Sequence, residues 1–318
     1  YYQAKLLRIL KKLRLLYIIT KRMYTLKNDK LKISVKKTGA ELCKITSIKN
    51  KTDFMWDADP NVWGSYAPNL FPIIGALKED AYVFENKKYE LPKHGFVRHN
   101  EDVMLHEQTE NSLTFKLVSN DVLFKNYPFK FEFYMTYTLT DNSLKVNHTI
   151  KNMDTKTLYF SVGGHPAFKC PVFKNENYVD YFLEFESAEN SKRHMINMEN
   201  GLISSETEPV FNNSNKIHLA HDLFHEDALV FKDLKSRTVT LKSIKNGGIL
   251  SVDYNDFPYL GIWAKPNGNY VCIEPWLGIA DNETTNQKLK DKEGILSLDS
   301  NKTFEAAYNI EIHNSHLV

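Results

Sequence analysis

The chain has 318 residues, 42% of them hydrophobic and 25% charged, and its formal net charge is +2. This composition is typical of a globular protein and argues against a disordered or fibrous one. Residues 1–22 contain seven Lys or Arg and no acidic residue, so the rest of the chain has 34 basic and 39 acidic residues, a net charge of −5. A mildly acidic body argues against a nucleic-acid-binding surface.

Residues 1–22 form a basic, amphipathic segment whose apolar positions 6, 9, 10, 13, 16 and 17 follow a helical period. Charges interrupt it too often for a membrane span, which needs about 20 mostly apolar residues. A membrane-surface or partner helix is one interpretation. We favour an upstream extension or leader, followed by one domain over 23–318 with no membrane segment.

Three cysteines, Cys43, Cys170 and Cys272, are spread widely along the chain and form no CxxC pair. An odd and sparse set fits a reducing compartment better than a disulfide framework, so we expect a cytoplasmic protein. The side chains are expected to be small buried hydrophobic groups.

Alternation of apolar and polar residues dominates the chain after Met23. It is clearest at 129–139 and 144–150, on either side of the turn at Asp141-Asn142, and predicts a hairpin with one buried face. Similar patterns predict further strands at 31–36, 41–48, 113–118, 157–162, 180–186, 227–232, 237–242, 249–254, 260–264, 270–274 and 304–312. Many short strands and few helices indicate an all-β protein, a large antiparallel sandwich or barrel.

Three distant segments each present one proton-handling side chain in an aromatic or proline-rich setting. They are Leu91-Pro-Lys-His-Gly-Phe-Val-Arg98, Gly163-Gly-His-Pro-Ala-Phe168 and Ile273-Glu-Pro-Trp-Leu-Gly278. His94, His165 and Glu274 are a sufficient set for moving protons on a sugar, and aromatic rings are suitable surfaces for a pyranose. Each residue taken alone also fits a structural or solvent-exposed role, and Glu274 could reach solvent where Pro275 breaks its strand.

A second histidine group, at 218, 221 and 225, would share one face if it were helical, as a zinc site requires. It lacks the HExxH pattern, and the surrounding residues indicate a connecting turn. We therefore expect solvated loop histidines and no metal site. P-loop, GxGxxG and GxSxG motifs are absent from the sequence, which argues against nucleotide-binding and serine-hydrolase functions.

The three segments together, in this order and spacing, resemble the aldose 1-epimerase (galactose mutarotase) superfamily, and most closely its LacX-like branch. The resemblance covers roughly 24–314 and extends to residues 71–75 and 227–231. It implies one large antiparallel β-sandwich of the galactose-mutarotase type, or supersandwich, with an open cleft on one sheet.

The resemblance also implies roles for individual residues. Glu274 would be the general base, His165 the general acid, and His94 would hold and polarise the sugar. Asp227 would bind sugar hydroxyls, and we add as substrate-binding residues Arg98, Lys78, Phe71, Phe168 and Trp276. The sequence departs from the family at Ala76, where an arginine is usual, and Lys78 is the nearest cation that could supply the charge.

The expected activity is therefore the interconversion of the α and β anomers of a hexose, with a monosaccharide as the partner molecule and no cofactor or metal. A hexose-phosphate 1-epimerase and a non-catalytic carbohydrate-binding or regulatory protein on the same fold stay open as alternatives. The sequence also leaves a homodimer open.

Overall fold

The computed structural model describes residues 23–318, and the amphipathic segment expected at 1–22 lies outside the described residues. Two large sheets dominate the structure, and every pairing between named strands is antiparallel. Within residues 23–318, no helix is long and apolar enough to cross a membrane.

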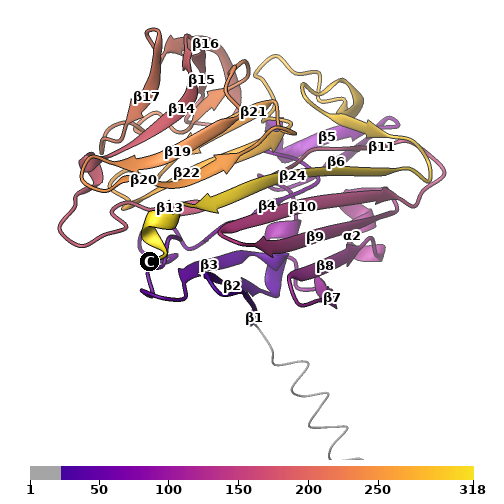
Figure 1. Cartoon of the computed structure of the whole chain (residues 1–318). Coiled ribbons are helices and arrows are strands. Elements are labelled where there is room, and N and C mark those ends of the chain that lie inside the picture. Colours follow the sequence, from indigo (N-terminus) through magenta and orange to yellow (C-terminus); the bar gives the residue numbers. More distant parts are fainter. Residues whose placement is uncertain (1–22) are drawn as a thin grey trace, which may run out of the picture.

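The larger sheet has nine strands and runs across the molecule in Figure 1. Its order is β17 (Ser214–His218), β14 (Tyr181–Glu189), β19 (Thr238–Ser243), β20 (Gly247–Asp253), β24 (Thr303–Ile312), β10 (Ser143–Asn152), β9 (Phe131–Thr140), β8 (Ser112–Val118) and β7 (Met104–Gln108).

The second sheet has eight strands. Its order is β16 (Ile203–Pro209), β15 (Lys192–Ile196), β18 (Leu229–Phe231), β21 (Tyr259–Trp263), β22 (Tyr270–Leu277), β12 (Val162–Gly164) and β4 (Asn69–Leu70), and β13 (Ala167–Lys169) also pairs with β22. The central strand β22 is buried along its whole length.

Smaller elements complete the fold. A three-stranded sheet contains β1 (Met23–Lys27), β2 (Leu31–Lys36) and β3 (Leu42–Ser47), and the strand pairs are β5 (Ala81–Phe84) with β6 (Lys87–Glu90) and β11 (Leu158–Phe160) with β23 (Leu296–Leu298). The α-helix is α2 (Asp121–Asn126), and the 3-10 helices are η1 (Thr38–Ala40), η2 (Lys78–Asp80), η3 (Val97–His99), η4 (Tyr178–Asp180), η5 (Leu289–Asp291) and η6 (Asn314–His316).

The predicted hairpin is confirmed as β9 and β10, whose side chains alternate between buried and half-buried along both strands. This alternation arises because successive side chains point to opposite faces of a sheet. The inner faces of the two large sheets meet in one apolar core. For example, Phe71, next to β4, stacks on Phe133 of β9 with ring centroids 4.7 Å apart.

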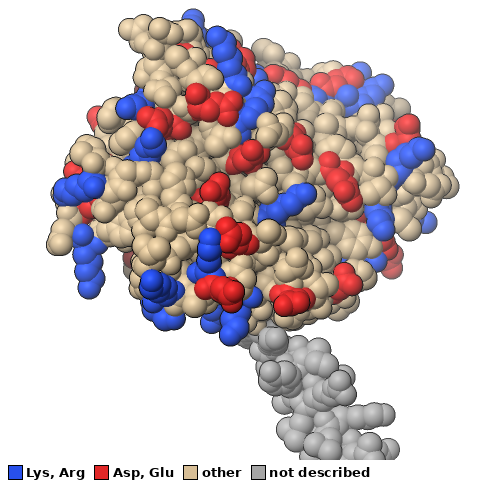
Figure 2. All heavy atoms as spheres, viewed as in Figure 1, with Lys and Arg blue, Asp and Glu red and all other residues tan. Residues whose placement is uncertain are grey.

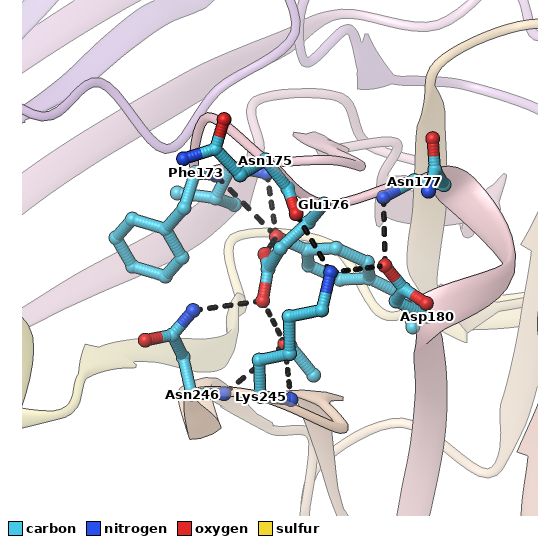
Figure 3. Close-up of polar contacts among 10 residues, drawn as sticks. Phe173, Asn175, Glu176, Asn177, Asp180, Lys245 and Asn246 are labelled. Atoms are coloured by element: carbon cyan, nitrogen blue, oxygen red, sulfur yellow. Dashed lines mark hydrogen bonds and ion pairs between the residues drawn. The ribbon is translucent and has the colours of Figure 1, made fainter.

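A buried polar network fastens the segment after β13 to the turn between β19 and β20 (Figure 3). The Glu176 carboxylate accepts hydrogen bonds from Tyr181 Oη, Ser243 Oγ and, at 2.7 Å, Asn246 Nδ2. Lys245 Nζ adds a bond of 2.7 Å to the Asn175 carbonyl. Because both carboxylate oxygens have partners, the network stabilises this end of the sandwich without offering free groups to a ligand.

Candidate active site

A cavity of about 480 Å³ lies against the eight-stranded sheet, a size ordinary for a small-molecule site. Six of the nine residues predicted to form the site line it: His94, Arg98, His165, Asp227, Glu274 and Trp276. They come from segments that are distant in sequence, so the sheet brings together what the sequence separates.

Strand register brings His165 and Glu274 together. β13 pairs with β22 through Ala167 and Cys272, and the Ile273 amide donates to the Pro166 carbonyl at 3.2 Å. Continuing this register by one step places His165 opposite Glu274, with both side chains on the same face. His165 Nε2 lies 3.2 Å from Glu274 Oε2, and both side chains are buried.

The indole of Trp63 covers this pair. It stacks on the His165 ring with centroids 4.9 Å apart and an interplanar angle of 27°, and Trp263 meets the same imidazole edge-on at 5.8 Å and lies 5.5 Å from Trp63. The two indoles fix the imidazole plane and remove water from around it. His165 is thus held as a rigid group beside the carboxylate.

His94 occupies a strained position next to the same pair. Its φ is +68°, a left-handed value that is rare for a residue other than glycine. The following Gly95 has φ +71°, and a Cβ there would lie 2.3 Å from the Phe71 carbonyl oxygen, so only glycine fits. His94 Nδ1 accepts a hydrogen bond of 3.1 Å from the Gly75 amide, which places the proton of the neutral ring on Nε2 as a donor.

Burial controls the electrostatics of the site. It raises the pKa of Glu274 well above its ordinary value, and Asp227 raises it further, while Lys93 and Arg98 act in the opposite direction. Burial also lowers the pKa values of His165 and His94, with a further contribution from Arg98. Glu274 and His165 are therefore driven toward a state in which the pair shares a single proton.

Unpaired polar atoms gather around this cavity. Within residues 23–318, seven buried side-chain nitrogen or oxygen atoms make no hydrogen bond of good geometry, and four of them belong to cavity-lining residues: Arg98 Nε, His165 Nδ1, Glu274 Oε2 and Trp276 Nε1. Although Glu274 Oε2 is close to His165, it is not aligned with it as a hydrogen bond. Buried polar groups without partners are rare elsewhere in proteins, so this concentration indicates a site for a polar ligand.

Two further predicted residues complete the polar wall. Arg98, in η3, donates from Nη2 to Ser65 Oγ at 3.3 Å and leaves its Nε–H unpaired. Asp227 has φ +63°, and its Oδ1 accepts a hydrogen bond of 2.8 Å from the Ala228 amide. Its second oxygen has no partner of its own among the described residues and can accept a hydroxyl.

Phe71 and Phe168 do not line the cavity, contrary to the expectation from sequence. Both are fully buried between the sheets, Phe71 against Phe133 and Phe168 in β13 opposite Val271. Alternation explains the outcome for Phe168, because His165 and Ala167 face the cavity side of the sheet and Phe168 therefore points to the opposite side. Trp276 is the one ring of the predicted three that lines the cavity.

Lys78 also lies away from the cavity wall. Its Nζ donates to the Glu283 carbonyl at 2.9 Å, and its amide donates to Asp281 Oδ2 at 3.0 Å. These bonds turn the side chain toward the loop after β22, so it does not supply a cation in place of the arginine missing at Ala76. Arg98 is the guanidinium that lines the cavity.

The structure decides two local points that the sequence left open. Pro275 does not end its strand: β22 continues to Leu277, Pro275 pairs with Leu260, and Glu274 is 1% exposed. The connecting turn predicted around the histidines is present at 221–226, where His221 and His225 lie, whereas His218 ends β17. One of them, His225, nevertheless lines the cavity.

Sequence reasoning missed Trp63, Trp263, Lys93, Lys265 and His225 as lining residues. Lys93 precedes His94, and this adjacency was the available signal. Trp63 lies in a turn-rich stretch without periodicity, and only the tertiary fold brings it over His165.

Comparisons with known proteins agree with this geometry. The family model described as aldose 1-epimerase matches residues 22–287. The plasmid-encoded protein LacX of Lactococcus lactis subsp. lactis is 36% identical over 299 residues, which cover 91% of this chain and 99% of that protein. The chromosomal LacX of the same organism matches over the same extent.

Solved structures show the same architecture. A galactose mutarotase related enzyme from Lactobacillus acidophilus superposes with a TM-score of 0.87 at 36% identity, covering 92% of this chain and 97% of that one. A galactose mutarotase-like protein from Lactobacillus casei ATCC 334 superposes with a TM-score of 0.85 at 29% identity, covering 92% of this chain and 100% of that one. The fold is thus the galactose-mutarotase type of β-sandwich. The chain belongs to the aldose 1-epimerase family and is similar to its LacX members.

Proposed function

We propose that this protein is an aldose 1-epimerase that interconverts the α and β anomers of a hexose. The observation that carries the proposal is the concentration of unpaired buried polar atoms around the His165–Glu274 pair. A polyhydroxylated ring offers donors and acceptors to such atoms, and its C–H face can lie on the indole of Trp276.

Anomer exchange requires one base and one acid. Glu274 takes the proton from the C1 hydroxyl, His165 gives a proton to the ring oxygen, and the C1–O5 bond breaks to leave an open-chain aldehyde. Rotation about C1–C2 presents the other carbonyl face, and ring closure returns both protons by the reverse path. No net oxidation or proton uptake occurs.

The two groups need only one proton between them. Before ring opening the proton is on His165, and after it the proton is on Glu274. Burial favours a single proton on the pair and places it on Glu274 in the empty site. Ring opening of a bound sugar uses the form with the same proton on His165, so proton transfer within the pair precedes the chemical step. His94 can donate from Nε2 to a sugar oxygen while its Nδ1 stays bonded to the Gly75 amide.

Polarimetry of freshly dissolved α-D-galactose and α-D-glucose tests the proposal. The protein should accelerate mutarotation, and Glu274→Gln should remove most of the acceleration because a positioned acid or base is worth about 10²–10⁴-fold. Glu107→Gln, on the exposed edge strand β7, is the matched control and should behave as wild type. Tight binding of sugar without acceleration would instead favour a non-catalytic carbohydrate-binding protein.

A sugar phosphate is a second candidate substrate. Lys93 and Lys265 line the cavity, and within residues 23–318 neither ammonium group has an ion-pair partner. Unpaired cations at a cavity wall are suited to a phosphate dianion. Measuring the mutarotation kinetics of the hexose 6-phosphates beside those of the free hexoses decides the question. If a sugar phosphate is the substrate, its KM should be much lower than that of the free sugar. Lys265→Gln should then raise the KM of the phosphate and leave the KM of the free sugar unchanged.

A further inference from the structure

Cys272 lies directly beside the catalytic pair, and the proton-transfer mechanism does not use it. It is on β22 two residues before Glu274, so the two side chains share one face of the strand. Donor atoms of His165, Cys272 and Glu274 all lie within 4.8 Å of one another. The three residues are 6%, 0% and 1% exposed.

The Cys272 thiol differs from the other two thiols in its surroundings. Cys43 Sγ donates to the Glu41 carbonyl at 3.3 Å, and Cys170 Sγ approaches the Phe168 carbonyl at 3.9 Å. Within residues 23–318, Cys272 Sγ makes no hydrogen bond, and Glu274 Oε2 beside it makes none either. Two potential metal-ligand atoms without hydrogen-bond partners, Cys272 Sγ and Glu274 Oε2, therefore lie next to the imidazole of His165.

One nitrogen, one sulfur and one carboxylate oxygen form a donor set typical of zinc. Around a tetrahedral zinc ion, with bonds of about 2.0–2.3 Å, ligand atoms lie roughly 3.3–3.8 Å apart. The His165–Glu274 separation of 3.2 Å is already close to that spacing, so the ligands need to move by roughly 1 Å at most. A thiolate and a carboxylate also cancel the double charge of the ion, as a buried site requires.

We propose that His165, Cys272 and Glu274 bind one zinc-type divalent cation, and that this cation and sugar turnover exclude each other. His165 and Glu274 line the cavity and Cys272 is fully buried beside them, so a fourth ligand would reach the ion from the cavity side. The thiol loses its proton on binding, and both proton-transfer groups become metal ligands. The inhibition rests on the function proposed above, whereas the binding does not.

Cobalt(II) is the spectroscopic probe for the binding. Titration into the full chain should produce the visible bands of tetrahedral cobalt together with a near-ultraviolet thiolate-to-cobalt band, at a stoichiometry of one. Cys272→Ser should lose the thiolate band and weaken affinity at least tenfold, because even groups that only support a metal ligand cost about 10–100-fold. Cys43→Ser, an equally buried cysteine on β3, should titrate as wild type.

The outcomes separate the two proposals. A wild-type spectrum without a thiolate band, or one that Cys272→Ser leaves unchanged, overturns the metal site. If Cys272→Ser does not fold, Glu274→Gln replaces it and should weaken cobalt binding to a similar extent. With an active sugar, zinc should raise the apparent KM and EDTA should restore it. Cobalt binding without turnover of any sugar would uphold the metal site and contradict the epimerase.

Discussion

Gly261→Ala is predicted to damage turnover through the position of one indole. Gly261 lies opposite Glu274 in the β21–β22 pairing, so a side chain there would point to the cavity face. A Cβ built on Gly261 would lie 2.5 Å from Cη2 of Trp276 and 2.6 Å from its Cζ2. Because carbon atoms pack at about 3.5–4.0 Å, the ring must move by roughly 1 Å or more.

That displacement should affect both stability and chemistry. Overpacking of this kind costs about 1–3 kcal/mol of unfolding free energy, and a misplacement of 1 Å in an active site costs up to about 10²-fold in rate. The assay is kcat and KM for mutarotation at a temperature where thermal melting shows that the variant is folded. Gly64→Ala, whose added Cβ would lie 3.8 Å from the Pro60 Cα, is the matched control and should be close to neutral. A folded Gly261→Ala protein with wild-type kcat and KM would refute a role for the Trp276 ring.

Three other predictions concern the His165–Glu274 pair, the Trp63 indole that stacks on it, and the buried ion pair between Asp281 and Lys292. Because burial lowers the pKa of His165, the pair takes up a second proton only at acid pH, so the acid limb of turnover against pH should lie well below pH 6.5. The alkaline limb follows the raised pKa of Glu274, where the pair loses its single proton. An acid midpoint at or above pH 6.5 would contradict this. Trp63→Ala removes the indole stacked on His165 and should lower kcat by up to about tenfold, the equivalent of 0.5–1.5 kcal/mol, with Trp63→Phe recovering most of it. Lys292 is 3% exposed, and its Nζ lies 2.8 Å from Asp281 Oδ1, so Asp281→Asn leaves a buried ammonium group without its counter-charge. Urea unfolding should show that the free energy of unfolding falls by about 3–5 kcal/mol. A decrease below about 1 kcal/mol would be inconsistent with the buried pair.

Strands with one buried face could be predicted from sequence, and strands at an edge could not. β9 and β10 alternate between buried and half-buried along ten residues each, and the sequence shows the same alternation. β16, at the end of the eight-stranded sheet, is buried only at Ile203 and largely exposed from Ser205 onward. An edge strand that packs against little needs no hydrophobic pattern, so no sequence signal marked it.

Residues that stand inside the three motif segments, such as His165 and Glu274, could be predicted from the sequence and do line the cavity. Phe168 was assigned to the site because it lies close to His165 in sequence, and Phe71 because residues 71–75 resemble a family segment. Both side chains fill the core instead. For Phe168 the reason is that residues of opposite parity on a strand point to opposite faces. The converse holds for Trp63, which covers His165 from a distant turn and could be placed only by the tertiary structure.

Exchange NMR of an equilibrium mixture of anomers tests the central claim most directly, because it detects α–β interconversion without a net reaction. Saturation of the α-anomer H1 signal of the accepted sugar should transfer to the β signal with wild-type protein. It should not transfer with Glu274→Gln, nor with the methyl glycoside, which has no C1 hydroxyl proton to lose. Equal transfer by wild type and Glu274→Gln would contradict the account, because Glu274 would then not be the group that takes the proton.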